Sequence, residues 1–106
     1  MKMLIAIVRP ERLQCVKDAL REAGVNGMTI THVTGRGKQS GLVFTNRVGS
    51  FVVDELDKVK LEVVLEDDGR VDEVIDVIKR SAETGHLGDG WIFEVPVERS
   101  VRIRSE

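Results

Sequence analysis

Residues 59–85 read VKLEVVLEDDGRVDEVIDVIKRSAETG, and this stretch encodes a strand, a turn and a helix in succession. Valine or leucine occupies every second position of 59–65, which predicts a strand with one apolar face. The turn Asp67-Asp68-Gly69 follows. Apolar side chains then recur at helical spacing, at Val71, Val74, Ile75, Ile78 and Ala82. Gly85 marks the end of this helix, so the stretch predicts one strand–helix unit.

The N-terminal part of the chain repeats this unit. Residues 3–8 form an apolar, β-branched run that stops at Pro10, which predicts a buried strand. A helix is expected over 11–23, before Gly24, because apolar side chains recur at Leu13, Val16, Leu20 and Ala23. Residues 4–24 and 61–85 therefore share one strand–helix pattern. In an alignment of the two segments Val16 corresponds to Val74 and Leu20 corresponds to Ile78.

Two more strands, over 28–34 and 91–97, complete a βαββαβ order. This order favours an α+β, ferredoxin-like fold, in which a four-stranded antiparallel sheet carries both helices on one face. We expect residues 1–106 to form a single domain. The other face of the sheet needs cover, and another copy of the chain is the simplest cover, so we predict an oligomer.

Length and composition narrow the class of protein. A chain of 106 residues with 42% hydrophobic content can bury one core but has little room for an internal cleft, so a ligand site is expected between subunits. The net charge of −2 and pI near 5.7 argue against nucleic-acid binding and a polybasic membrane anchor. The single Cys15 cannot form an internal disulfide and is expected to be half-buried. With no signal peptide and no apolar run of the roughly 20 residues that span a bilayer, the cytoplasm is the expected compartment.

Two glycine-rich segments are candidate ligand loops. Thr84-Gly85-His86-Leu87-Gly88-Asp89-Gly90 separates a helix from a strand, and three glycines there indicate that something approaches the backbone, a phosphate being the natural candidate. The alternative is a plain connecting turn after a glycine-capped helix. The second segment, Gly35-Arg36-Gly37-Lys38-Gln39-Ser40-Gly41, has neither Walker nor dinucleotide spacing.

The connection from Thr34 to Lys58 is far longer than the usual ~4–6 residues. Apolar triplets at 42–44 and 51–53 flank a polar stretch, which predicts a hairpin with Arg47 near its tip. The hairpin either extends the main sheet or forms a mobile arm that docks onto a partner. We favour the arm, because loops of this length seldom serve only as connections.

In this order of elements, in the Thr84–Gly90 turn and in shorter landmarks, the chain resembles the PII nitrogen-signalling proteins. The landmarks are Arg9-Pro10, Gly27-Met28-Thr29, the segment from Val53 to Lys60, and Arg102-Ile103-Arg104. The resemblance covers nearly the whole chain. It implies a homotrimer that senses ATP or ADP together with 2-oxoglutarate in clefts between subunits. The long loop, about 36–57, is called the T-loop in that family and carries the signal to target proteins.

The resemblance also implies which residues bind each ligand. Adenine is expected near Thr29 and Val64. The rest of the nucleotide is expected to meet Gly35, Gly37, Lys38, Gly88, Asp89, Gly90, Arg102 and Arg104. Arg102 and Arg104 are two apart, so in a strand they share a face and can grip one polyphosphate. For 2-oxoglutarate the expected residues are Gln39, Gly41 and Lys58, with Gln39 also holding Mg²⁺ when nucleotide and keto acid are bound.

Several positions depart from the family pattern. Trp91 stands where a phosphate-binding lysine is usual, Lys38 replaces an arginine, and His86 replaces a lysine. Weaker ATP binding, a preference for ADP or AMP, and compensation by other residues all remain open. The chain has no tyrosine, and Phe51 occupies the position at which many relatives are uridylylated, so that modification is excluded there.

Phe44, Arg47 and Phe51 are the expected partner-binding residues of the loop. The resemblance favours an ammonium transporter, through Arg47, or a nitrogen-metabolism enzyme as the target, with membrane contact only through a transporter. The alternative is a divergent PII-like sensor of ADP, AMP or another small ligand that regulates a different transporter or carbon pathway, and Trp91 is its best support. An enzyme is disfavoured, because His32 and His86 are far apart and no nucleophile–base constellation accompanies them.

Overall fold

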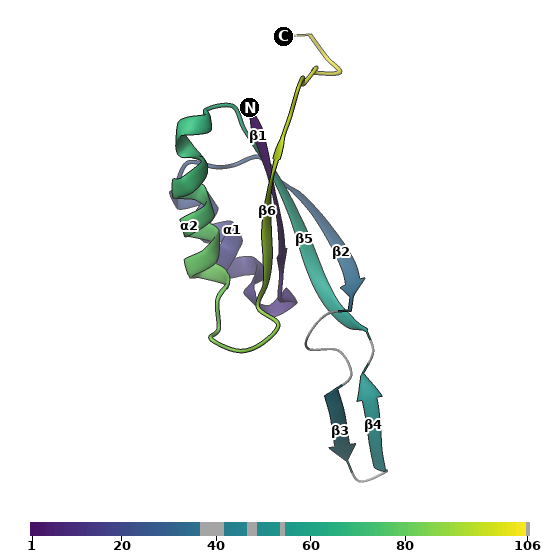
Figure 1. Ribbon diagram of the computed structural model, residues 1–106. Coiled ribbons are helices and arrows are strands. Elements are labelled where there is room, and N and C mark those ends of the chain that lie inside the picture. Colours follow the sequence, from purple (N-terminus) through teal and green to yellow (C-terminus); the bar gives the residue numbers. More distant parts are fainter. Residues whose placement is uncertain (37–41, 47–48, 54, 106) are drawn as a thin grey trace.

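Four strands form one antiparallel sheet in the order β2-β5-β1-β6, as Figure 1 shows. The computed structural model describes residues 1–36, 42–46, 49–53 and 55–105, with side chains for 1–36 and 55–105. The strands are β1 (Lys2–Val8), β2 (Thr29–Gly35), β5 (Leu56–Leu65) and β6 (Gly90–Pro96). β1 lies between β5 and β6, with Ala6 opposite both Leu61 and Ile92. The predicted ferredoxin-like topology is confirmed.

Both helices, α1 (Leu13–Glu22) and α2 (Val71–Ala82), cover the same face of the sheet (Figure 1). Each begins after a short 3₁₀ turn, η1 (Pro10–Arg12) or η2 (Asp68–Arg70). The predicted apolar stripes face the core: Val16, Leu20, Val74 and Ile78 are all buried. They pack against the inward residues of the two central strands, which are Leu4, Ala6, Val8, Val59, Leu61, Val63 and Leu65. This burial is the main driving force for the fold.

Two arginines link the helices reciprocally. Arg12, at the start of α1, donates from Nη2 to the carbonyl of Ser81 at 2.7 Å, near the end of α2. Arg70, at the start of α2, donates from Nη2 to the carbonyl of Ala23 at 2.6 Å, at the end of α1. A cation beside the last carbonyls of a helix stabilises its negative end.

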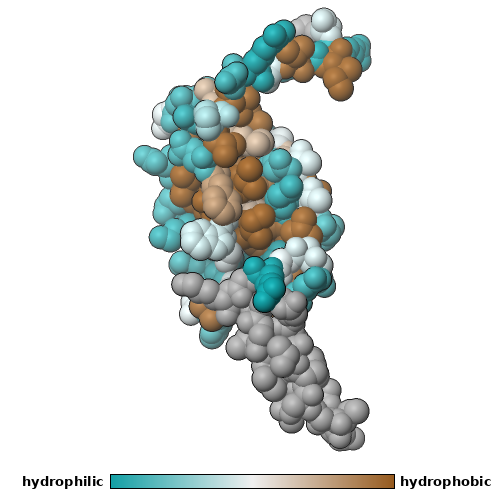
Figure 2. Space-filling model, turned by 45° about the vertical axis from the view of Figure 1, so that its right-hand side comes forward, coloured by the Kyte–Doolittle hydropathy of each residue, from teal (hydrophilic) through white to brown (hydrophobic). Residues whose placement is uncertain are grey.

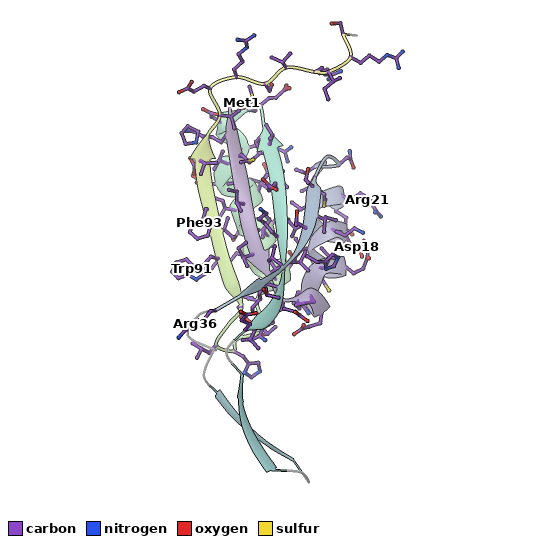
Figure 3. All side chains as sticks on the ribbon, turned by 90° about the vertical axis from the view of Figure 1, so that its right-hand side faces the viewer. Met1, Asp18, Arg21, Arg36, Trp91 and Phe93 are labelled. Atoms are coloured by element: carbon purple, nitrogen blue, oxygen red, sulfur yellow. The ribbon has the colours of Figure 1, made fainter. Side chains whose placement is uncertain are left out.

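The face of the sheet opposite the helices carries exposed apolar side chains. Trp91 and Phe93 project from β6 onto this face and stack with ring centroids 6.0 Å apart, as Figure 3 shows. Their exposed fractions are 69% and 48%, and Val64 on β5 is similarly exposed at 49%. Figure 2 shows apolar side chains gathered over the strands of this face. Few monomers leave such a surface open to water.

A separate two-stranded sheet projects beyond one end of the main sheet (Figure 1). It consists of β3 (Leu42–Asn46) and β4 (Gly49–Val53), paired so that Leu42 faces Val53. The predicted hairpin is therefore confirmed, and the alternative that it extends the main sheet is wrong. Arg47 lies outside the described residues.

Three other expectations are corrected. Within 97–105 the structure has no strand, so Arg102 and Arg104 do not share a strand face. Cys15 is exposed on α1 rather than half-buried. β5 begins at Leu56, earlier than the alternating pattern indicated. In the part of the chain that the structure describes, no helix combines the length and apolar character needed to cross a membrane.

Candidate functional site

The glycine-rich loop between α2 and β6 is closed by its own aspartate. The carboxylate of Asp89 accepts hydrogen bonds from the backbone N–H groups of Thr84 at 2.7 Å and Gly85 at 3.0 Å, and from the Thr84 hydroxyl. Gly85 and Gly88 have φ of +83° and +93°, which side-chain-bearing residues rarely adopt. The loop is therefore folded by hydrogen bonds between its own residues.

Gly90 is required for a different reason. Its φ is +117°, and a Cβ added there would lie 1.8 Å from the carbonyl oxygen of Ile7. The backbone of β1 thus makes the close approach that the sequence attributed to a ligand at this glycine. Any larger residue would separate β6 from β1 at the point where the loop joins the sheet.

Two cations from the sheet hold the loop from outside. Arg9, directly after β1, donates from Nε to Asp89 at 2.9 Å and from Nη2 to the Leu87 carbonyl at 2.6 Å. Lys58, on β5, donates from Nζ to the Gly88 carbonyl at 2.6 Å. Sequence reasoning named Lys58 but gave Arg9 no role. The sequence feature that could have identified Arg9 is its position, since it is a cation placed directly between an apolar strand and Pro10.

The pKa values of Asp89 and Lys58 are both lowered at this loop, for different reasons. The hydrogen bond from the Thr84 hydroxyl, followed by those from the Thr84 backbone, Arg9 and Gly85, holds the pKa of Asp89 well below its usual range. Partial burial, with a smaller contribution from nearby Arg9, lowers the pKa of Lys58, while Glu11 and Asp89 act in the opposite direction. Asp89 therefore remains a carboxylate at neutral pH.

A cavity of about 310 Å³ opens beside this loop, on the open face of the sheet. It is lined by Ile7, Gly35, Arg36, Leu56, Lys58, Leu87, Gly88, Asp89, Gly90 and Trp91. Figure 3 shows Arg36 below Trp91, at the end of the sheet from which the hairpin projects. Gly35, Lys58 and Gly88–Gly90, all named from the sequence, thus line one cavity.

The lining of this cavity fits an anionic ligand with an apolar part. Arg36 and Lys58 supply positive charge, and the glycines leave the backbone accessible. Ile7, Leu56, Leu87 and Trp91 supply apolar walls. Mixed lining of this kind is typical of small-molecule sites.

The other predicted nucleotide residues lie at the opposite end of the sheet. Thr29 begins β2 and faces Glu62, whereas Gly35 ends the same strand. At ~3.3 Å per residue the two are about 20 Å apart. Val64 is opposite Met3, and the segment carrying Arg102 and Arg104 leaves the sheet near Met1, since the Val97 N–H donates to the Met1 carbonyl. A single chain therefore does not bring Thr29, Val64, Arg102 and Arg104 next to the cavity at Gly35 and Gly88–Gly90.

The remaining site predictions depend on the loop. Gly37, Lys38, Gln39 and Gly41 lie outside the described residues, as Arg47 does, so those assignments stay predictions. Phe44 on β3 faces Phe51 on β4 in the hairpin register, which places both positions at the same level of the arm.

Comparison with known proteins adds an independent observation. The family model described as "Nitrogen regulatory protein P-II" matches residues 1–106. Nitrogen regulatory protein P-II 2 of Methanothermobacter thermautotrophicus is 48% identical over 105 residues, covering 99% of this chain and 90% of the relative. The P-II protein of Azospirillum brasilense is 48% identical and P-II 1 of Escherichia coli 47%, each covering 99% of this chain and 93% of the relative.

Proposed function

The chain belongs to the nitrogen regulatory protein P-II family, and on that premise we propose that it is a regulatory signalling protein rather than an enzyme. It binds an adenine nucleotide, ATP or ADP, together with 2-oxoglutarate, and it controls target proteins through the hairpin arm. Mg²⁺, held with the help of Gln39, accompanies ATP and 2-oxoglutarate.

The observation that carries this proposal is the position of the cavity relative to the arm. Gly35 ends β2 and Leu56 begins β5, and both line the cavity. The arm is inserted between these two residues. A ligand in the cavity touches both strand ends that carry the arm, so it can favour one arm conformation over another through its differential affinity.

A site between copies of the chain accounts for the split in the nucleotide residues. The group at Thr29 and Val64 and the group at Gly35 and Gly88–Gly90 lie at opposite ends of one sheet. A second copy whose opposite end approaches the cavity brings both groups to one ligand. The exposed apolar face with Trp91 and Phe93 supports such an assembly, which we propose to be a homotrimer.

The proposed targets are an ammonium transporter or a nitrogen-metabolism enzyme, and the proposed compartment is the cytoplasm. Phe51 lies on β4, within the arm, and a phenyl ring has no hydroxyl to accept a nucleotidyl group. Ligand binding, rather than uridylylation at this position, is therefore the proposed switch.

A second candidate function is favoured by Trp91. This indole lines the cavity beside Gly88–Gly90 and carries no charge to offset a triphosphate. A divergent P-II-like sensor of ADP, AMP or another small ligand, serving another transporter or a carbon pathway, would have such a site.

Calorimetric titration with AMP, ADP and ATP, with Mg²⁺ and with or without 2-oxoglutarate, tests both functions. The nitrogen sensor requires ATP binding that 2-oxoglutarate strengthens. Binding of only ADP or AMP, or of no nucleotide, contradicts the nitrogen sensor and favours the divergent sensor. Size-exclusion chromatography with light scattering gives the subunit number in the same samples, and a monomer would contradict the shared site.

Trp91→Lys is the matched variant for the choice between these functions. It adds a cation at the cavity wall, so affinity for ATP should rise more than affinity for AMP if missing charge limits binding. An unchanged ratio of the two affinities would mean that other residues compensate for the indole.

A further inference from the structure

Arg9 connects the end of β1 to the glycine-rich loop. It follows β1 directly and precedes Pro10, and its backbone is extended, with φ −66° and ψ 140°. Val8, its neighbour, is paired with Val59 on one side and Gly90 on the other. Only 14% of its side chain is exposed. The backbone that carries Arg9 is therefore fixed by the sheet, and its largely buried side chain extends from there to the loop.

That guanidinium binds the loop at two successive points. Nε donates to the Asp89 carboxylate at 2.9 Å, and Nη2 donates to the Leu87 carbonyl at 2.6 Å. The two donors of a planar guanidinium have a fixed relative geometry. The distance and angle between the Asp89 side chain and the Leu87 peptide are thereby fixed, together with Gly88 between them.

The same contact changes the charge at the cavity wall. Asp89 lines the cavity beside Gly88 and Gly90, where an anionic ligand is proposed to lie. An uncompensated carboxylate there would repel phosphate groups. The guanidinium of Arg9 neutralises it from the side, with the Thr84 and Gly85 donors completing its hydrogen bonds.

We propose that Arg9 is a positioning residue of the nucleotide site, which holds residues 87–89 in the conformation that receives phosphate and cancels the charge of Asp89. This inference rests on the proposed function. Arg9 acts through the loop and not by touching the ligand. Its contribution therefore grows with the number of phosphate groups, because the repulsion that it removes grows with ligand charge.

The test is calorimetric titration of full-length wild type, Arg9→Ala and Arg12→Ala with AMP, ADP and ATP. For Arg9→Ala we expect ATP affinity to fall at least tenfold, with a smaller loss for ADP and the smallest for AMP. Arg12→Ala is the matched control, because Arg12 also donates to a carbonyl across the fold, at Ser81, but does not line the cavity. Its affinity for all three nucleotides should match the wild type.

Two further variants separate positioning from folding. Arg9→Lys keeps the charge but cannot bridge Asp89 and Leu87 with a fixed fork, so it should recover only part of the lost affinity. Arg9→Gln removes the charge and keeps an amide donor. If Arg9→Ala does not fold, Arg9→Gln decides the matter, and a reduced ATP affinity with a smaller loss for AMP supports the inference.

Several outcomes would overturn it. Wild-type affinity in Arg9→Ala or Arg9→Gln removes the proposed role while leaving the nucleotide site intact. An equal loss for AMP, ADP and ATP, or the same loss in Arg12→Ala, indicates a general effect on folding. A wild-type protein that binds none of the three nucleotides rejects the proposed function and this inference with it.

Discussion

The two strand–helix halves of the chain share one internal architecture and differ at their caps. Val16 and Leu20 of α1 occupy the same core positions as Val74 and Ile78 of α2. The two arginines that link the helices are also at equivalent positions, since Arg12 corresponds to Arg70. Their acceptors are equivalent as well: Ser81, which accepts from Arg12, corresponds to Ala23, which accepts from Arg70. The packing of the two halves is therefore a property of the repeated unit, and the site must come from what the halves do not share.

The first difference lies at the start of the two 3₁₀ turns. Asp67 caps η2 locally, since its side chain accepts a hydrogen bond from the Gly69 N–H at 2.8 Å. The corresponding residue before η1 is Arg9, whose side chain makes no capping bond to its own turn among the described residues. It reaches instead to Leu87 and Asp89. The first half thus has the long side chain of Arg9 where the second half has the local cap Asp67. Arg9 thereby connects the first half to the glycine-rich loop of the second half.

The second difference lies at the helix ends. α1 is followed by Gly24 at φ +82°, and the N–H of the buried Val25 donates a hydrogen bond to the Leu20 carbonyl. β2 then begins at Thr29. α2 is followed by Glu83 in an extended conformation and then by the loop that Asp89 closes. The same unit therefore ends once in a compact cap and once in a candidate ligand loop.

The largest expected effect comes from the residues that the halves share. Leu20→Ala and Ile78→Ala each remove a fully buried side chain, which should lower the free energy of unfolding by about 2–5 kcal/mol. Urea unfolding followed by circular dichroism measures both. Similar losses would confirm equivalent packing, and a loss below about 1 kcal/mol in one variant would show that its half is more loosely packed.

A smaller effect is expected at the reciprocal arginines. Arg12→Ala and Arg70→Ala each leave a helix-terminal carbonyl without its charged donor, which should cost about 1–2 kcal/mol in unfolding free energy. The double variant is the informative comparison. The two hydrogen bonds lie at different ends of the helix pair, so the two losses in unfolding free energy should add. Strong non-additivity would contradict the independence of the two hydrogen bonds.

Asp67→Ala should cost less, about 0.5–1 kcal/mol, because it removes one exposed capping bond. Nucleotide affinity should not change, in contrast to Arg9→Ala at the corresponding position of the first half. Chemical denaturation and calorimetry on the same preparation give both quantities. A drop in affinity for Asp67→Ala would mean that both caps, and not only the divergent one, support the site.

Much of the fold was predictable because it depends on local periodicity. The stripes at Val16, Leu20, Val74 and Ile78 and the alternation at 59–65 reflect burial on one face, which a sequence records directly. The start of β5 was missed because Leu56–Lys58 continue the ladder with β2 without an alternating apolar pattern. The strand expected at Arg102 and Arg104 is absent because it has no strand to pair with. β1 begins at Lys2, which pairs with Pro96, so the residues beyond Val97 have no neighbouring strand on that side within the described chain.

The candidate site was only partly predictable. The glycine-rich segments were identified from their composition and Lys58 through the family resemblance, and Gly35, Gly88, Gly90 and Lys58 line one cavity. Arg9 was missed because its partners Leu87 and Asp89 are distant in sequence and are brought to it by the β1–β6 pairing. That only glycine fits at Gly90 follows from the Ile7 carbonyl, which likewise reflects tertiary pairing.

The smallest effect concerns acid, and it compares the carboxylate of the loop with one on the helix surface. Hydrogen bonds, first from the Thr84 hydroxyl and also from Arg9, lower the pKa of Asp89 in the folded state, and a bond from Arg70 lowers that of Glu73. A lowered carboxyl pKa adds stability above the unfolded-state pKa of about 4, and this stability is lost as pH falls below that value. Asp89 has several donors and is 25% exposed, whereas Glu73 has one partner and is 56% exposed. Asp89→Asn should therefore reduce the loss of unfolding free energy between pH 6 and pH 3 more than Glu73→Gln does. Equal pH profiles for the two variants would mean that the loop contacts of Asp89 contribute no more to folding than an ordinary surface ion pair.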